Sequence, residues 1–272
     1  MLTDPDKANS ANSSATQAAE FLRQSLGEVP FDIAIILGSG WKNSTAKLGK
    51  KLASVPASHV PGFSASIVPG HAGTLEAVRS HSGKRVLLIG ARTHLYEGKS
   101  VDAVAHGVRT AAKLGAKTIL LTNGAGGIRE HWAPGQPVLI SDHINLTGKS
   151  PIEGANFVDL TDLYSQRLRD LARTVDPSLE EGIYVQFRGP HYETPAEVQM
   201  AKSMGGDIVG MSTAIEAIAA REAGMEVLGL SLITNLAAGI SPHPLSHEEV
   251  IQAGKSAETT IGKLLSGIVR GL

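Results

Sequence analysis

Polar side chains stand at the ends of several apolar segments of this sequence, and they divide into two chemical groups. The first group can donate hydrogen bonds to an oxyanion through hydroxyls, a guanidinium, an imidazole or backbone amides. Its members are Ser39, Arg92, His94, the amides of residues 124–127 and Ser212. The second group, Glu193 and Asn235, offers the donors and acceptors that a flat heterocycle with both kinds of edge requires. The pattern indicates an anion site beside a heterocycle, and it identifies neither ligand.

The segment KTILLTNGAGG, residues 117–127, carries the central part of this pattern. Residues 118–122 have the length and composition of a buried parallel strand, and Gly124, Gly126 and Gly127 predict a sharp turn with positive φ angles after it. Exposed amides at such a turn would bind an anion. No GxGxxG or GK[ST] motif follows, so a dinucleotide or nucleoside triphosphate site has little support. A tight connection without a ligand is the alternative interpretation.

Arg92, His94 and Tyr96 alternate in the segment ARTHLYEG, and an extended chain would place all three on one side. A planar guanidinium next to an imidazole suits a phosphate better than a metal. The alternatives are a surface ion pair of Arg92 with Glu97 and a satisfied core imidazole at His94.

Glu193 lies between prolines and beside Tyr192, an unusual place for a merely solvated carboxylate. The alternative is that it caps the helix beginning at Pro195, because acidic residues are common at helix starts.

Apolar strands alternate with amphipathic helices along the chain. The expected strands are 31–37, 75–80, 85–90, 118–122, 138–140 with the following SDHINL, 182–187, 207–211 and 227–234. The expected helices are 18–26, 101–114, 162–175, one from Pro195, 213–223 and 248–269. The alternation predicts a three-layer α/β/α sandwich around a mixed, largely parallel sheet, whose carboxyl edge gathers the polar loops. We expect one domain over residues 1–272, with a poorly ordered segment over about 1–17.

The composition narrows the class of partner. A formal net charge of −1, from 25 basic and 26 acidic residues, argues against a nucleic-acid groove or a membrane-surface patch, so we expect a small molecule. The absence of cysteine excludes thiolate chemistry and suits a reducing cytoplasm, where we expect the protein. His243 and His247 are four apart, but prolines flank His243 and no acidic ligand motif accompanies the pair, so we expect no metal site. No signal peptide or membrane span is expected.

Nine short motifs occur along the chain in a fixed order: ILGSG, VPGHAG, ARTHLYEG, TNGAGG, SDHINL, GPHYETPAE, VGMST, SLITN and HEEV. Together they resemble the trimeric, low-molecular-mass purine nucleoside phosphorylases, from about Phe31 to the last helix. The resemblance implies a pentosyltransferase of the nucleoside phosphorylase fold, active in purine salvage. It implies reversible phosphorolysis of inosine, guanosine and their 2′-deoxy forms to free purine and (deoxy)ribose 1-phosphate. It also implies a homotrimer that needs no cofactor, with inorganic phosphate as co-substrate.

The resemblance also assigns roles to individual residues. The phosphate would be held by Ser39, His71, Arg92, His94, Asn123, Gly124 and Ser212. The base would be held by Tyr192, Glu193, Thr234 and Asn235, and the ribose by Tyr96, Met211, His247 and Phe157 from a neighbouring subunit. Asn235, Glu193 and His94 would be the catalytic groups. The chain departs from the family pattern in having Gly124, which implies a more flexible phosphate loop, and Tyr192 in place of phenylalanine.

Four alternatives stay open on the sequence. A 5′-methylthioadenosine phosphorylase would favour an aspartate at the position of Asn235 and an apolar pocket near His247. Xanthosine preference would depend on residues near Asn235. A non-catalytic binder would bind nucleoside without cleaving it, and a hydrolytic nucleosidase would cleave without phosphate and leave Arg92 and His94 without an anion.

Overall fold

The computed structural model describes residues 5–64 and 73–272, and within them nine strands form one mixed sheet. The strands are β1 (Ile33–Ile36), β2 (Gly49–Pro56), β3 (Thr74–Ser80), β4 (Arg85–Ile89), β5 (Thr118–Gly127), β6 (Pro137–Asn145), β7 (Glu181–Gln186), β8 (Ile208–Gly210) and β9 (Glu226–Leu236). Their order in the sheet is β2-β3-β4-β1-β5-β8-β7-β6-β9. Strand β9 also pairs with β5 in parallel, so β5, β8, β7, β6 and β9 close into a ring. The α/β fold with a mixed sheet is confirmed, and the ring is a feature that the sequence does not predict.

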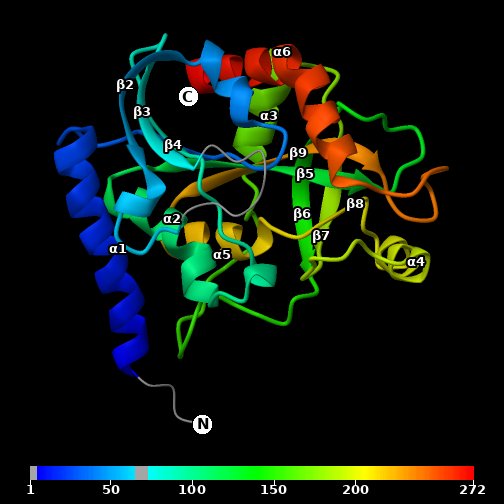
Figure 1. The fold of residues 1–272 in the computed structure, drawn as a ribbon, viewed down its shortest axis with the longest axis horizontal. Coiled ribbons are helices and arrows are strands. Elements are labelled where there is room, and N and C mark those ends of the chain that lie inside the picture. The colour runs from blue at the N-terminus through cyan, green and yellow to red at the C-terminus, as the bar shows by residue number, and fades with distance from the viewer. Residues whose placement is uncertain (1–4, 65–72) are drawn as a thin grey trace.

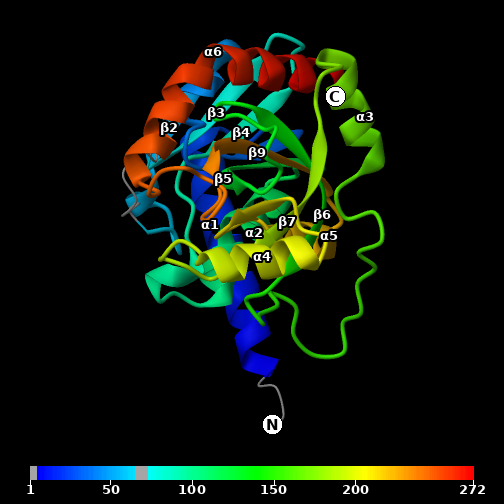
Figure 2. The same cartoon turned by 90° about the vertical axis from the view of Figure 1, so that its right-hand side faces the viewer.

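Helices cover both faces of the sheet (Figure 1). They are α1 (Pro5–Leu26), α2 (Val101–Lys113), α3 (Gln166–Val175), α4 (Pro195–Ser203), α5 (Ala214–Glu222) and α6 (His247–Gly271). Helices α1, α2 and α5 lie on one face and α3 and α6 on the other, whereas α4 lies beside the ring of strands (Figure 2). Among the described residues, no helix combines the length and the apolar character needed to cross a membrane.

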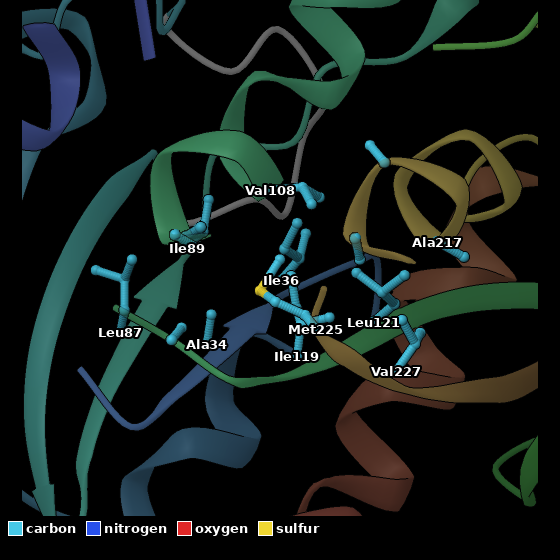
Figure 3. Close-up of a cluster of buried hydrophobic side chains, with 14 of the residues drawn as sticks. Ala34, Ile36, Leu87, Ile89, Val108, Ile119, Leu121, Ala217, Met225 and Val227 are labelled. Carbon is cyan, nitrogen blue, oxygen red and sulfur yellow. The ribbon is translucent and has the colours of Figure 1, made fainter. Parts of the chain in front are cut away.

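The alternation of side chains in β1 explains why the sheet is covered on both sides. Ala34 and Ile36 belong to one apolar cluster and Ile33 and Ile35 to another, and all four are at most 2% exposed. Figure 3 shows Ala34 and Ile36 on the side that Val108 of α2 also faces. Full burial of each isoleucine is worth about 2 kcal/mol, which favours a strand with helices on both faces over one with a solvated face.

Helix α1 begins at Pro5, well before the predicted start at Ala18. The buried Ala15, Ala18, Ala19 and Leu22 follow the helical spacing, and the last three join the cluster beneath α2. Over residues 5–17 the structure has helix where the sequence predicts a poorly ordered segment.

Candidate active site

A cavity of about 330 Å³ opens at the carboxyl ends of β5 and β9. Thirteen residues assigned to the site from the sequence line it: Ser39, Arg92, His94, Tyr96, Asn123, Gly124, Tyr192, Glu193, Met211, Ser212, Thr234, Asn235 and His247. Of the other two assigned residues, His71 lies outside the described residues, and Phe157, in the loop before α3, is 94% exposed and is not among the lining residues.

The cavity opens where β5 changes its neighbour in the sheet. Along one edge, β5 pairs with β9 from Thr118 to Gly127. Along the other edge it pairs with β1 as far as Leu121 and with β8 from Gly126 onward. Asn123, Gly124 and Ala125 lie in the interval between these two partners and line the cavity. The sheet thus provides a gap in which backbone and side-chain groups of one strand face a ligand.

The glycines of β5 serve close packing. The predicted sharp turn is wrong, because β5 continues to Gly127, and Gly124, Gly126 and Gly127 do not have positive φ. A Cβ atom on Gly124 would lie 3.1 Å from Cγ2 of Thr234 and 3.2 Å from the carbonyl oxygen of Ser39. Gly124 therefore lets the loop that carries Ser39 approach β5 and β9 closely, and the greater flexibility expected of this segment stays a prediction.

Arg92 is the fixed cation of the site. Its Nε donates to Oε1 of Glu216 at 2.9 Å, and its Nη1 donates to the carbonyl of Thr122 at 2.6 Å and lies 3.5 Å from Oγ of Ser212. Both carboxylate and guanidinium are at most 2% exposed, so the predicted alternative of a surface ion pair with Glu97 is wrong. Nη2 is buried without a hydrogen-bond partner among the described residues. A buried donor in this state is suited to an anionic ligand.

His94, and not Arg92, is paired with the carboxylate of Glu97. Its Nδ1 lies 3.0 Å from Oε1 of Glu97, and burial, followed by the charge of Arg92, lowers the pKa of His94 to about 3. Tyr96 belongs to a short 3-10 helix, Leu95–Glu97, so the predicted extended alternation ends at His94. Tyr96 nevertheless reaches the cavity because its ring stacks on the imidazole, with centroids 4.7 Å apart.

Ser212 lies between β8 and α5, and its surroundings are polar and buried. Its backbone N–H donates to the hydroxyl of Tyr184 at 3.2 Å. The next residue, Thr213, accepts a hydrogen bond at 2.9 Å from Nδ2 of Asn123, which ties the turn to β5. Asn123 and Ser212 are 2% and 9% exposed, so the donors of the anion site are held by the fold before any ligand arrives.

Glu193 supplies a buried carboxylate to the lining of the same cavity. The alternative that it caps α4 is wrong, because Thr194 and Glu197 form the capping box of that helix. Glu193 is 6% exposed, its Oε1 has no hydrogen-bond partner among the described residues, and burial raises its pKa. A carboxylate in this state can accept a hydrogen bond from a ligand N–H.

Thr234 and Asn235 face the cavity together because β9 contains a bulge. In the pairing with β5, Ala125 is opposite Ile233 and Gly126 is opposite Asn235, so Thr234 is the additional residue. Consecutive residues of a regular strand point to opposite faces, and a bulge relaxes that rule. The hydroxyl of Thr234 lies 2.7 Å from Oδ1 of Asn235, and Nδ2 of Asn235 donates to the carbonyl of Leu236 at 2.9 Å, which orients the amide.

The remaining lining residues close the outer part of the cavity. Tyr192 is 37% exposed, and burial of the rest of the ring, with the charge of Glu249, raises the pKa of its hydroxyl. His247 is the first residue of α6, whose N-cap Ser246 accepts from the backbone N–H of Glu249. Met211 lines the cavity beside Ser212.

No group of three or more His, Asp or Glu residues within the described ranges could hold a metal ion.

Glu216 and Thr213 support the donors of the site, and the sequence analysis does not identify them. The signal was present, because Thr213 and Glu216 have the spacing of a capping box at the start of α5.

The chain is similar to known proteins over most of its length. A family model described as the phosphorylase superfamily matches residues 32–270. A purine nucleoside phosphorylase of Cellulomonas sp. is 57% identical over 260 residues, which cover 94% of this chain and 92% of that relative. The purine nucleoside phosphorylase of Mycobacterium tuberculosis is 50% identical over 266 residues, covering 98% and 97%. Among solved structures, Schistosoma mansoni purine nucleoside phosphorylase in complex with inosine has a TM-score of 0.87 and 32% identity, covering 96% of both chains.

Proposed function

The chain belongs to the phosphorylase superfamily and, within it, to the purine nucleoside phosphorylases, and from this premise we propose how its cavity performs the reaction. The enzyme is a pentosyltransferase that converts inosine- or guanosine-type nucleosides and phosphate reversibly into free purine and pentose 1-phosphate. The observation that supports the assignment of residues is that one cavity contains both Arg92 and Glu193, whose Nη2 and Oε1 atoms have no hydrogen-bond partner within the described ranges. The first suits a phosphate oxygen and the second suits the N1–H group of a 6-oxopurine.

Phosphate binds at the β5 side of the cavity. Arg92 donates to one oxygen, and the hydroxyls of Ser39 and Ser212 and the backbone N–H of Gly124 donate to others. His94 and Asn123, which also line the cavity, belong to the same phosphate subsite. His71 completes this set as a prediction, since it lies outside the described residues. Described donors that converge on one anion fix its position for attack on the sugar, so that the second reactant meets the first at a high effective concentration.

The purine binds between Glu193 and Asn235. Glu193 accepts from N1–H, while Asn235 forms hydrogen bonds with N7 and O6, and Tyr192 and Thr234 complete this subsite. The bond from C1′ to N9 breaks first, so positive charge develops on the sugar and negative charge on the leaving base, as in other glycosyl transfers. Phosphate then forms the new bond to C1′. Asn235 stabilises the purine because its amide is already oriented by Thr234 and Leu236.

The ribose lies between the two ligands, beside Tyr96, Met211 and His247. Phe157 is not among the residues that line the cavity of its own subunit, and its ring is almost fully exposed to solvent, which is unusual for a large apolar side chain. We propose that it covers the ribose site of a neighbouring subunit in a homotrimer. The absence of a cofactor is part of the same proposal, because phosphate is both nucleophile and counter-charge. The cytoplasmic location stays a prediction.

A single assay tests the function. Release of hypoxanthine from inosine is followed with and without inorganic phosphate, with adenosine as a parallel substrate. We expect release only with phosphate, together with an equal amount of ribose 1-phosphate, and weak or no cleavage of adenosine, whose N1 has no hydrogen for Glu193. Phosphate-independent release would support a nucleosidase, and tight binding without cleavage would support a binding protein. Equal rates on adenosine and inosine would refute the role given to Glu193.

A further inference from the structure

Glu216 is a buried carboxylate that the proposed reaction does not use. It is the third residue of α5, it is 1% exposed, and it does not line the cavity. A buried carboxylate is costly to keep unless each oxygen has a partner. Each oxygen of Glu216 has one: Oε1 accepts from Nε of Arg92 at 2.9 Å, and Oε2 accepts from the backbone N–H of Thr213 at 3.0 Å.

The two partners belong to the two segments that supply phosphate donors. On one side, Glu216 and the carbonyl of Thr122 hold Nε and Nη1 of Arg92, which leaves Nη2 for a ligand. A guanidinium held at two of its nitrogens cannot rotate, so the direction of the third is fixed.

On the other side, Thr213 has a φ angle of 84°, a left-handed conformation that a β-branched residue rarely adopts. Its N–H is held by Glu216 and its hydroxyl accepts from Asn123. Because Ser212 immediately precedes Thr213, the strained backbone sets where the hydroxyl of Ser212 points. Ser212 Oγ lies 3.5 Å from Nη1 of Arg92, so both donors converge from the two ends of one carboxylate.

We propose that Glu216 is a positioning residue for phosphate, in that it holds the Arg92 guanidinium and the strained Thr213 backbone in one arrangement. The proposal depends on the assignment of Arg92 and Ser212 to the phosphate. A purely electrostatic role would have the opposite effect. The negative charge of Glu216 would offset the positive charge of Arg92 and thereby weaken phosphate binding.

The test compares the unmodified enzyme with Glu216→Gln, which keeps the shape but replaces one acceptor oxygen by a donor that faces an N–H group. We expect KM for phosphate to rise at least about tenfold, the scale of one lost charge-assisted hydrogen bond. We expect KM for inosine at saturating phosphate, and Kd for hypoxanthine measured by calorimetry, to stay within about twofold. Glu181→Gln is the matched control, because Glu181, like Glu216, accepts two hydrogen bonds, in its case from Arg169 and Arg173, but lies outside the cavity.

Each other outcome overturns the proposal. An unchanged phosphate KM shows that positioning does not depend on Glu216, and a lower one shows that its charge alone matters. Equal losses of phosphate and hypoxanthine binding show a general structural role. If Glu216→Gln does not fold, the double variant Thr213→Gly, Glu216→Gln removes the backbone strain and is measured in the same way, and failure of both to fold also counts against the proposal. Absence of phosphate-dependent cleavage in the unmodified enzyme would instead refute the proposed function.

Discussion

Oε1 of Glu97 accepts two hydrogen bonds from His94, one from its backbone N–H at 2.8 Å and one from Nδ1 at 3.0 Å. The carboxylate can only accept, so the proton of a neutral His94 is on Nδ1 and Nε2 is an acceptor. An acceptor nitrogen repels a phosphate dianion unless one of the two carries an additional proton.

Phosphate binding is therefore expected to be accompanied by proton uptake. The dianion favours the charged imidazole of His94. Burial and the positive charge of Arg92 oppose that charged form and lower the pKa of His94. Calorimetric titrations with phosphate in buffers of different ionisation enthalpy measure the uptake, and Kd for phosphate should rise as the pH increases above neutrality. Glu97→Gln, which removes the carboxylate beside Nδ1, should reduce the uptake. Heats that do not depend on the buffer would contradict this prediction.

The stability of the unliganded enzyme should decrease as the pH falls below about 6.5. The folded pKa of His94 is lowered to about 3, so between these values the unfolded chain binds a proton that the folded chain does not. Burial also lowers the pKa values of His106 and His143, which act in the same direction. Each histidine contributes at most about 1.4 kcal/mol per pH unit to the change in stability within its window.

Thermal unfolding between pH 7 and pH 4 measures this slope of stability against pH, and His94→Asn should make the slope shallower. An unchanged slope would show that His94 is not the group responsible.

Asn235→Ala should lower kcat by about two to three orders of magnitude, because one preorganised hydrogen-bond donor at the leaving group is worth about 3 kcal/mol of barrier. Steady-state kinetics with inosine measure the effect. Ser231→Ala is the control on the same strand, since Ser231 is fully buried and its Oγ has no hydrogen-bond partner among the described residues. A near-normal kcat for Asn235→Ala would refute the proposed role of the amide.

Phe157→Ala should raise KM for inosine about five- to tenfold without changing the fold, because the proposed subunit contact with ribose is lost. Native mass spectrometry should show a trimer for the unmodified enzyme. Val29→Ala, at an apolar residue that is 61% exposed elsewhere on the surface, is the control and should behave normally. A monomer with an unchanged KM for Phe157→Ala would exclude the shared site.

Strand positions and cavity residues could be predicted from the sequence because both depend on local pattern. The strands expected at 75–80 and 85–90 form the hairpin of β3 and β4, and apolar runs placed most strands within a few residues. The role of Gly124 was misjudged, because glycine permits both a positive φ and a close approach, and only the packing against Thr234 decides between them. The capping-box spacing places Glu216 at the start of α5, but its contact with Arg92 could not be predicted, because Arg92 is distant in sequence.

The additional residue in β9 has a consequence for how this chain can tolerate change in length. Loss of Thr234 would restore regular alternation and turn Asn235 away from the purine, although the apolar positions before it would still pack. Deletion of one residue from β9 should thus leave the hydrophobic core packed but abolish phosphorolysis. Homologous chains that have lost this position should be sought among folded proteins without phosphorolytic activity.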